Sequence, residues 1–302
     1  MLAILAPGQG SQTPGMLTAW LEDAELKNLL TSYSSAINLD LERLGTVADA
    51  DEIKDTANAQ PLIVAASLIS AHALGSDVNT SFVAGHSVGE IAAAALAATL
   101  TELDAMKLVH LRGQEMAKAA ALAPAGMAAV LGGERSVVLA AIKELGLVAA
   151  NDNGAGQIVA AGNLDALSKL APEGARVRAL AVAGAFHTPF MEPAVAPLRA
   201  MAKTIEASDA KISVISNKDG AVVSDGREVL DRIVNQIANP VRWDLCMQTL
   251  REQGVTGVIE LAPGGTLAGL IKRATPEIEQ LALKSPADIS AAREFAARHG
   301  KA

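Results

Sequence analysis

The stretch SFVAGHSVGEIAAAALAA, residues 81–98, places a serine between two glycines where an apolar run meets an alanine-rich run. The run 81–85 is short and apolar, as buried strands are, and residues 90–98 favour a helix. The order strand, G-x-S-x-G turn, helix is typical of a nucleophile elbow, which exposes the serine hydroxyl above the sheet edge. An ordinary tight turn with a helix-capping serine is the alternative. The stretch therefore predicts an α/β fold with Ser87 as its nucleophile.

Outward from this stretch, short apolar runs alternate with longer helical patterns. Residues 2–6 are entirely apolar and end at Pro7-Gly8, as expected of a first strand. Residues 60–74 carry few charges and predict a helix that is buried on most sides. Helices are also expected over 101–121, 193–205 and 227–237, and strands over 212–216 and 255–261. This alternation is typical of an α/β domain with parallel strands. The tail from Pro286 is expected to be a solvated helical segment.

A different pattern begins near Gly126. Strands are expected at 127–131, 147–150, 157–161 and 176–182, with helices at 134–145 and 164–170. The order β-α-β-β-α-β is that of a ferredoxin-like unit. We therefore predict a large α/β domain made of residues 1–123 and 187–302, with an inserted ferredoxin-like small subdomain over residues 124–186.

Composition narrows the class of protein. The chain has 302 residues, 50% of them hydrophobic, enough for a large core, and 33 acidic against 25 basic residues give a net charge of −8. An acidic chain is a poor candidate for nucleic-acid binding. The single cysteine, Cys246, excludes an internal disulfide and a cysteine metal cluster. The first residues lack a basic segment, so they indicate a strand rather than a signal peptide. We expect a cytoplasmic protein without metal or membrane association.

A serine nucleophile needs a base, and His187 is the histidine best placed to supply it. It follows a predicted strand and the loop Gly-Ala-Phe, and it precedes Thr-Pro, so it lies at a turn where catalytic groups gather. His86 adjoins Ser87 but is expected to point away across the turn. The other three histidines are expected to be structural or exposed: His72, His110 and His299. No acid that would orient His187 has a supporting context, and the acids that follow it are Asp209, Asp219, Asp225 and Asp244.

Two further features leave alternatives open. The loop Pro7-Gly-Gln-Gly-Ser-Gln12 lacks the glycine and lysine positions of nucleotide-binding loops. It either donates a backbone N–H to an oxyanion, together with the amide after the nucleophile, or simply connects strand to helix. Arg112 lies on a mostly apolar helix. It is either a structural residue or a bidentate ligand for a substrate carboxylate.

With these residues in view, the sequence resembles the malonyl-CoA:acyl carrier protein transacylase family, particularly its actinobacterial members. The resemblance covers nearly the whole chain. The matching stretches are APGQGSQ (6–12), AQPLIVAA (59–66), AGHSVGE (84–90), RGQEMA (112–117), ANDNGAGQIVAAG (150–162), GAFHTPFM (184–191), NPVRWDL (239–245) and APGGTLAGL (262–270).

The resemblance implies a hydrolase-like α/β fold with a ferredoxin-like insert, and it implies a role for each site residue. Ser87 would be the nucleophile and His187 the base, oriented by the main-chain carbonyl of Gln236 in place of a carboxylate. The backbone amides of Gln9 and Val88 would form the oxyanion hole. Arg112 would bind the malonyl carboxylate. The acyl pocket would be lined by Gln60, Asn153 and Phe186, the last resembling the malonyl-selecting pattern of polyketide acyltransferases.

The implied reaction is a ping-pong malonyl transfer through malonyl-Ser87, from malonyl-CoA to the phosphopantetheine thiol of an acyl carrier protein. It would supply fatty acid synthesis and, as a second use, polyketide synthesis, from a monomer that needs no cofactor. A serine hydrolase and a noncatalytic carrier-binding module are the rival interpretations. Docking of an acidic carrier would need a local basic surface, for which the candidates are Arg176, Arg178, Lys272 and Arg273.

Overall fold

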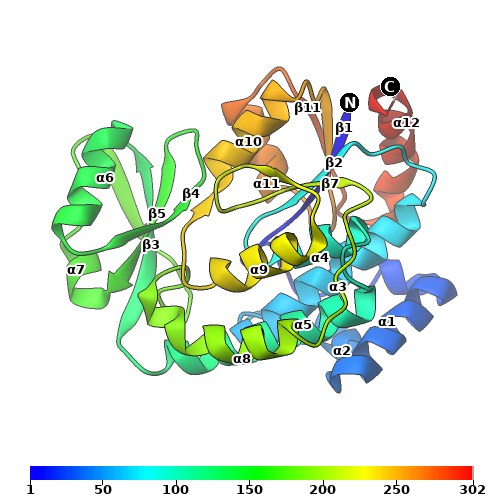
Figure 1. Ribbon diagram of the computed structural model, residues 1–302, viewed down its shortest axis with the longest axis horizontal. Helices are drawn as coiled ribbons and strands as arrows, with labels where there is room; N and C mark the ends of the chain where they lie inside the picture. The colour runs from blue at the N-terminus through cyan, green and yellow to red at the C-terminus, as the bar shows by residue number, and fades with distance from the viewer. Residues whose placement is uncertain (301–302) are drawn as a thin grey trace.

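Two β-sheets of different size organise the protein, described here over residues 1–300 from a computed structural model (Figure 1). The large sheet has the strand order β11-β10-β1-β2-β7-β8. Its strands are β1 (Leu2–Ala6), β2 (Phe82–Gly85), β7 (Ser213–Ile215), β8 (Val222–Val223), β10 (Gly257–Glu260) and β11 (Glu279–Ala282). Neighbouring strands pair in parallel, except that β8 at the edge runs antiparallel to β7. The α/β class with parallel strands is confirmed.

Strand β1 lies inside the large sheet and contributes side chains to the hydrophobic clusters on both of its faces. Leu2 and Ile4 belong to the cluster on one face, whereas Ala3 and Leu5 belong to the cluster on the other. This is the period-two alternation of a strand whose two faces are both covered. Ala6 pairs with Gly85 at the carboxyl ends of β1 and β2. The loops that leave these two strands therefore emerge side by side, at the edge where α/β sheets bind ligands.

Helices cover the large sheet on both faces (Figure 1). They are α1 (Ala24–Ile37), α2 (Leu41–Thr46), α3 (Thr56–Leu74), α4 (Gly89–Leu96), α5 (Glu102–Ala120), α8 (Glu192–Ala202), α9 (Gly226–Gln236), α10 (Trp243–Glu252), α11 (Thr266–Ala274) and α12 (Ile289–His299), with short 3-10 turns at Trp20–Glu22, Pro189–Met191 and Pro286–Asp288. Among the described residues, α3 alone has the length and hydropathy of a membrane span, but 72% of its most apolar window is buried inside the fold. It is the buried helix that its composition predicts.

The small sheet has the order β6-β3-β5-β4-β9 and stands apart at one end of the molecule, where most of it is green in Figure 1. Its elements are β3 (Ala125–Gly132), α6 (Arg135–Glu144), β4 (Val148–Asp152), β5 (Gln157–Asn163), α7 (Leu164–Ser168), β6 (Ala175–Ala179) and β9 (Val241–Arg242). The first six follow the predicted β-α-β-β-α-β order, which is confirmed. The fifth strand, β9, comes from far along the chain and pairs in parallel with β4. The domain boundaries at residues 123/124 and 186/187 stay a prediction.

Two expectations need correction. The strand expected to run to residue 182 ends at Ala179, and an irregular segment continues from there to His187. The tail is not solvated on all sides, because α12 buries Ala292 and Phe295 within the main hydrophobic cluster. Its apolar residues recur at helical spacing among charged ones, so one face packs inward while the other meets solvent.

Candidate active site

Ser87 lies at a sharp turn between β2 and α4, in a left-handed backbone conformation with φ of +53°. The glycines on either side are required by close packing. A Cβ atom on Gly85 would lie 2.0 Å from the main chain of Gly89, and one on Gly89 would lie 2.2 Å from the carbonyl oxygen of Ala6. Because no such contact is sterically possible, only glycine allows the turn that lifts the Ser87 hydroxyl out of the sheet.

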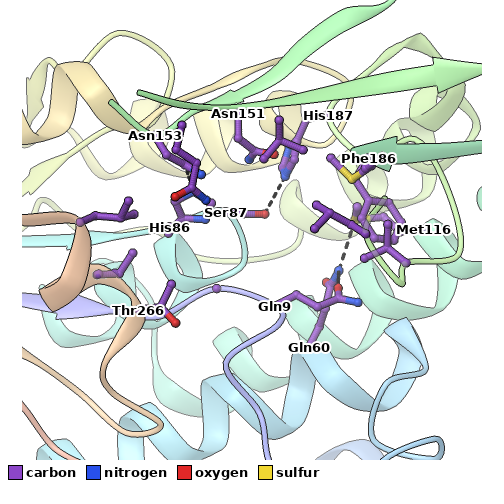
Figure 2. Close-up of a pocket in the computed structure, with 18 of the residues that line it drawn as sticks. Gln9, Gln60, His86, Ser87, Met116, Asn151, Asn153, Phe186, His187 and Thr266 are labelled. Carbon is purple, nitrogen blue, oxygen red and sulfur yellow. Dashed lines mark hydrogen bonds between the residues drawn. The ribbon is translucent and has the colours of Figure 1, made fainter. Parts of the chain in front are cut away.

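His187 faces this hydroxyl. Its Nε2 atom lies 2.7 Å from Ser87 Oγ (Figure 2). Its Nδ1 atom lies 2.8 Å from the main-chain carbonyl oxygen of Gln236. Burial and the positive charge of Arg112 lower the pKa of His187 to about 3. The neutral imidazole therefore donates from Nδ1 to the carbonyl and presents the Nε2 lone pair to the serine hydroxyl. This is the arrangement of a general base with its nucleophile.

The acids that follow His187 in the sequence are engaged elsewhere. Asp219 pairs with Arg232, and Asp244 pairs with Arg242. Asp225 caps α9, and Asp209 accepts a hydrogen bond from the backbone of Gly226. A carbonyl oxygen thus occupies the place that a carboxylate takes in other serine enzymes.

Arg112 reaches the same oxygen from α5. Its Nη2 atom donates to Ser87 Oγ at 3.2 Å and to the Gln236 side-chain oxygen at 2.9 Å, and its Nη1 atom donates to Gln60 Oε1 at 2.7 Å. The residue is 1% exposed, and within residues 1–300 no carboxylate forms a salt bridge with it. Burial lowers the pKa of Arg112 to about 10, while nearby Glu90 opposes the shift. The guanidinium therefore stays charged at neutral pH and is held by neutral oxygens only.

Two backbone N–H groups beside Ser87 are without partners. Within residues 1–300, neither the Gln9 N–H nor the Val88 N–H has a hydrogen-bond acceptor. Val88 precedes the first residue of α4, where the helix dipole adds partial positive charge. Free amides at this position fit the requirements of an oxyanion hole.

A cavity of about 220 Å³ opens in front of Ser87, between the large sheet and the small one (Figure 2). The site residues predicted from the sequence that line it are Gln9, Gln60, Ser87, Asn153, Phe186 and His187. Arg112 joins them through its contacts with Gln60 and Ser87. Residues that the sequence did not indicate also line it, among them Met116, Asn151, Gln157 and Thr266, and so does Arg273, which was expected only as a candidate for carrier docking. No cluster of three metal-ligating side chains occurs in the described part of the chain.

The position of the His86 side chain in the cavity was not predicted from the sequence. Its side chain lines the cavity, where Nε2 lies 2.8 Å from Asn153 Oδ1 and the ring meets the edge of Trp243. Its hydrogen-bond partner is Asn153, which directly follows β4 of the small sheet, and not Ser87. The contact between His86 and Asn153 could not be inferred from the sequence, because the two residues are 67 positions apart.

Comparisons with known proteins agree with this geometry. Residues 4–291 match the model of the acyl transferase domain family. The chain is 52% identical to the malonyl CoA-acyl carrier protein transacylase of Mycobacterium tuberculosis, over 96% of this chain and 98% of that protein. It is 33% identical to the protein of the same name from Bacillus subtilis, over 96% of each. The crystal structure of MCAT from Mycobacterium tuberculosis superposes with a TM-score of 0.94 at 51% identity, covering 97% of this chain and 99% of that chain.

Proposed function

The chain belongs to the acyl transferase family and is a malonyl-CoA:acyl carrier protein S-malonyltransferase, and from this premise we propose how its residues carry out the transfer. One observation carries the proposal. A single oxygen, Ser87 Oγ, contacts the His187 imidazole at 2.7 Å and the Arg112 guanidinium at 3.2 Å. A base and a carboxylate-binding cation thus converge on one nucleophile.

In the first half-reaction, His187 Nε2 takes the proton of the Ser87 hydroxyl as Oγ bonds to the thioester carbonyl carbon of malonyl-CoA. The negative charge moves to the carbonyl oxygen, where the N–H groups of Gln9 and Val88 each contribute roughly 3 kcal/mol of stabilisation. The carbon–sulfur bond then breaks, and CoA leaves as a thiol with the proton from His187 Nε2. The product is a malonyl ester of Ser87.

Arg112 selects the acyl group. Its present partners, the side-chain oxygens of Gln60 and Gln236, are neutral. The carboxylate of a malonyl group would be a stronger, charge-assisted partner and can accept two parallel hydrogen bonds. Gln60, Asn153 and Phe186 line the remainder of the acyl site, and the Phe186 ring limits the space beside the malonyl methylene.

The second half-reaction reverses the first. The phosphopantetheine thiol of the acyl carrier protein gives its proton to His187, attacks the ester carbonyl and releases Ser87 with its hydroxyl restored. The malonyl carrier serves fatty acid synthesis, and we propose polyketide synthesis as a second use. The proposal extends to a cytoplasmic monomer that binds neither membrane nor nucleic acid, the last supported by the net charge of −8.

Mass spectrometry of the intact protein after brief exposure to malonyl-CoA tests the site. We expect one added malonyl group, absent in Ser87→Ala and lost again when carrier protein bearing phosphopantetheine is added. In His187→Ala the ester should form about 100- to 10,000-fold more slowly. Release of free malonate without any accumulated ester would indicate a hydrolase. Transfer that persists in Ser87→Ala would exclude Ser87 as the nucleophile.

A further inference from the structure

A buried polar cluster lies beneath the nucleophile and, apart from the bond of the Gln236 side chain to Arg112, has no role in the transfer described above. Its members are Glu90 on α4, Asn217 after β7 and the side chain of Gln236 at the end of α9. All three are at least 95% buried, with exposures of 3%, 0% and 5%. Buried polar groups of this kind need hydrogen bonds to offset their desolvation, so their partners show what they hold in place.

Asn217 bonds to the backbone on both sides of the turn. Its Oδ1 atom accepts a hydrogen bond from the Ser87 N–H at 2.7 Å, and its Nδ2 atom donates to the carbonyl oxygen of Gly85 at 2.7 Å. Asn217 lies 130 residues beyond Ser87 in the sequence, so these bonds tie the end of β7 to the turn after β2. One side-chain amide therefore bridges the residue before the turn and the nucleophile itself.

Ser87 needs such support because of its backbone conformation. A residue other than glycine at φ of +53° is strained and persists only where its surroundings hold it. The bond from the Ser87 N–H to Asn217 fixes this peptide. The Ser87 carbonyl oxygen is held as well, since it accepts a hydrogen bond from Gln236 Nε2 at 3.1 Å.

Glu90 in turn holds the backbone of Asn217 and the side chain of Gln236. Its carboxylate accepts hydrogen bonds from the Asn217 backbone N–H and from Gln236 Nε2. Gln236 is thereby turned so that its Oε1 atom faces Arg112, while its own carbonyl oxygen holds His187. One cluster thus reaches the nucleophile, the base and the guanidinium at once.

We propose that Asn217 is a positioning residue for the nucleophile, which holds the Ser87 backbone in its left-handed conformation while Glu90 fixes Asn217 and Gln236. The inference rests on the proposed role of Ser87 and goes beyond it. Asn217 does not line the cavity, so its loss should disturb the reactivity of Ser87 and leave substrate binding intact.

The variant Asn217→Ala tests this inference, with Cys246→Ala as its matched control. Cys246 is buried, accepts a hydrogen bond from Asn217 Nδ2 at 3.7 Å and donates one to the carbonyl oxygen of Ser216, but within residues 1–300 it has no hydrogen bond to residues 85–89. Both variants remove buried atoms at nearly the same place. We expect Asn217→Ala to lower kcat about 10- to 100-fold, the scale of a displaced catalytic group, with KM for malonyl-CoA changed less than about threefold. Cys246→Ala should keep kcat within about twofold, as a substitution that leaves the reacting groups in place.

A second measurement tests the reactivity of Ser87 with a reagent that carries no malonyl group. The rate at which a small fluorophosphonate modifies Ser87 depends on the Ser87–His187 pair and not on binding of a carboxylate by Arg112. It should fall in Asn217→Ala by the same factor as kcat. An unchanged rate of phosphonylation, an unchanged kcat, or an equal loss in Cys246→Ala would overturn the proposal.

The variant Glu90→Gln carries the test if Asn217→Ala does not fold. Glutamine has nearly the same shape as glutamate, but its side-chain nitrogen cannot accept a hydrogen bond. Because both carboxylate oxygens of Glu90 accept bonds, one of the two bonds from Asn217 and Gln236 is lost in the variant. We expect kcat to fall several-fold at unchanged KM, and an unchanged kcat would refute the inference. Ser87→Ala distinguishes the proposed nucleophile from the proposed positioning residue. If Ser87→Ala is inactive while Asn217→Ala and Glu90→Gln are fully active, only the positioning role of Asn217 is refuted.

Discussion

The Nη2 atom of Arg112 lies 3.2 Å from the Oγ atom of Ser87, with no acidic side chain paired to the guanidinium in the described part of the chain. A fully buried cation without an anion is unfavourable unless polar groups surround it. Here the side-chain oxygens of Gln60 and Gln236 supply that surrounding. The free enzyme therefore keeps a positive charge next to its nucleophile, ready for an anionic acyl group.

Replacing Arg112 with alanine should change acyl selectivity. We expect kcat/KM for malonyl-CoA to fall about 100-fold or more, the usual cost of losing one partner of a buried charge pair. Transfer from acetyl-CoA should be kept or rise, because acetyl offers no carboxylate and leaves the wild-type charge unpaired. Parallel assays with the two thioesters measure this. Arg112→Lys keeps the charge but loses the planar, two-pronged guanidinium. Its kcat/KM for malonyl-CoA should therefore lie between those of the wild type and Arg112→Ala. An equal loss for both thioesters would contradict the role of Arg112.

The pH dependence of the reaction should reflect the lowered pKa of His187. Its pKa of about 3 means that the base form is present at all higher pH values and is lost only as the pH falls through about 3. We therefore expect kcat/KM for malonyl-CoA to stay level between about pH 5 and 8 in the Glu90→Gln variant, where residue 90 cannot titrate, since this ratio reports the free enzyme. A pH–rate profile, with folding checked by circular dichroism, measures this. An acid limb near the ordinary histidine value of 6.5 would show that His187 titrates normally.

Glu90 should make stability depend on pH in the opposite sense to most carboxylates. Burial raises the pKa of Glu90 from 4.5 to about 7, although hydrogen bonds from Asn217 and Gln236 oppose the shift. The folded state then binds the proton more tightly than the unfolded state. The stabilisation is fully present below pH 4.5 and is lost as the pH rises through 7.

Comparison with Glu90→Gln isolates this effect, because the variant cannot titrate at residue 90. The unfolding free energy of the wild type relative to the variant should decrease from about pH 5 to pH 8, by at most about 3 kcal/mol. Urea unfolding at a series of pH values gives the difference. A difference that stays constant, or that grows with pH, would rule out a raised pKa for Glu90.

Substitution of the elbow glycines should prevent folding of the active enzyme. In Gly85→Ala the new methyl group would lie 2.0 Å from the main chain of Gly89, which no side-chain rearrangement can relieve. We expect loss of soluble protein, or of all transfer activity together with a Tm lowered by several degrees. Gly269→Ala is the control, because its Cβ atom would meet only the end of the Arg273 side chain at 3.6 Å within a helix. Gly269→Ala should be neutral or slightly stabilising. A stable and active Gly85→Ala would refute the packing argument.

The sequence predicted those parts of the structure that local chemistry encodes. The turn at Ser87 follows from five consecutive residues, and the order of the small subdomain follows from alternating patterns within 124–186. Strand β9 was not predicted, because two residues carry no periodicity. Nor was the contact of Asn217 with Ser87, which depends on how β7 sits beside β2. A charged residue in the apolar run after the turn, Glu90, was the one signal of the cluster below it.

Roles for Arg112 and Gln236 came from the family resemblance and not from spacing. The structure places both against the Ser87–His187 pair, and their roles stay predictions. The reason is physical: the selection of an acyl group is a difference between two binding free energies, and a set of distances in the free enzyme gives neither.

The pairing of β9 with β4 has a mechanical consequence. An inserted body joined to its host only where the chain leaves and returns can swivel about those two tethers. Here Val241 and Arg242 add a third attachment, because they pair with Asn151 and Asp152 of the small sheet and lead directly into α10. A hydrogen-bonded contact outside the two tethers opposes such a swivel, and it does so next to Asn153, which lines the cavity.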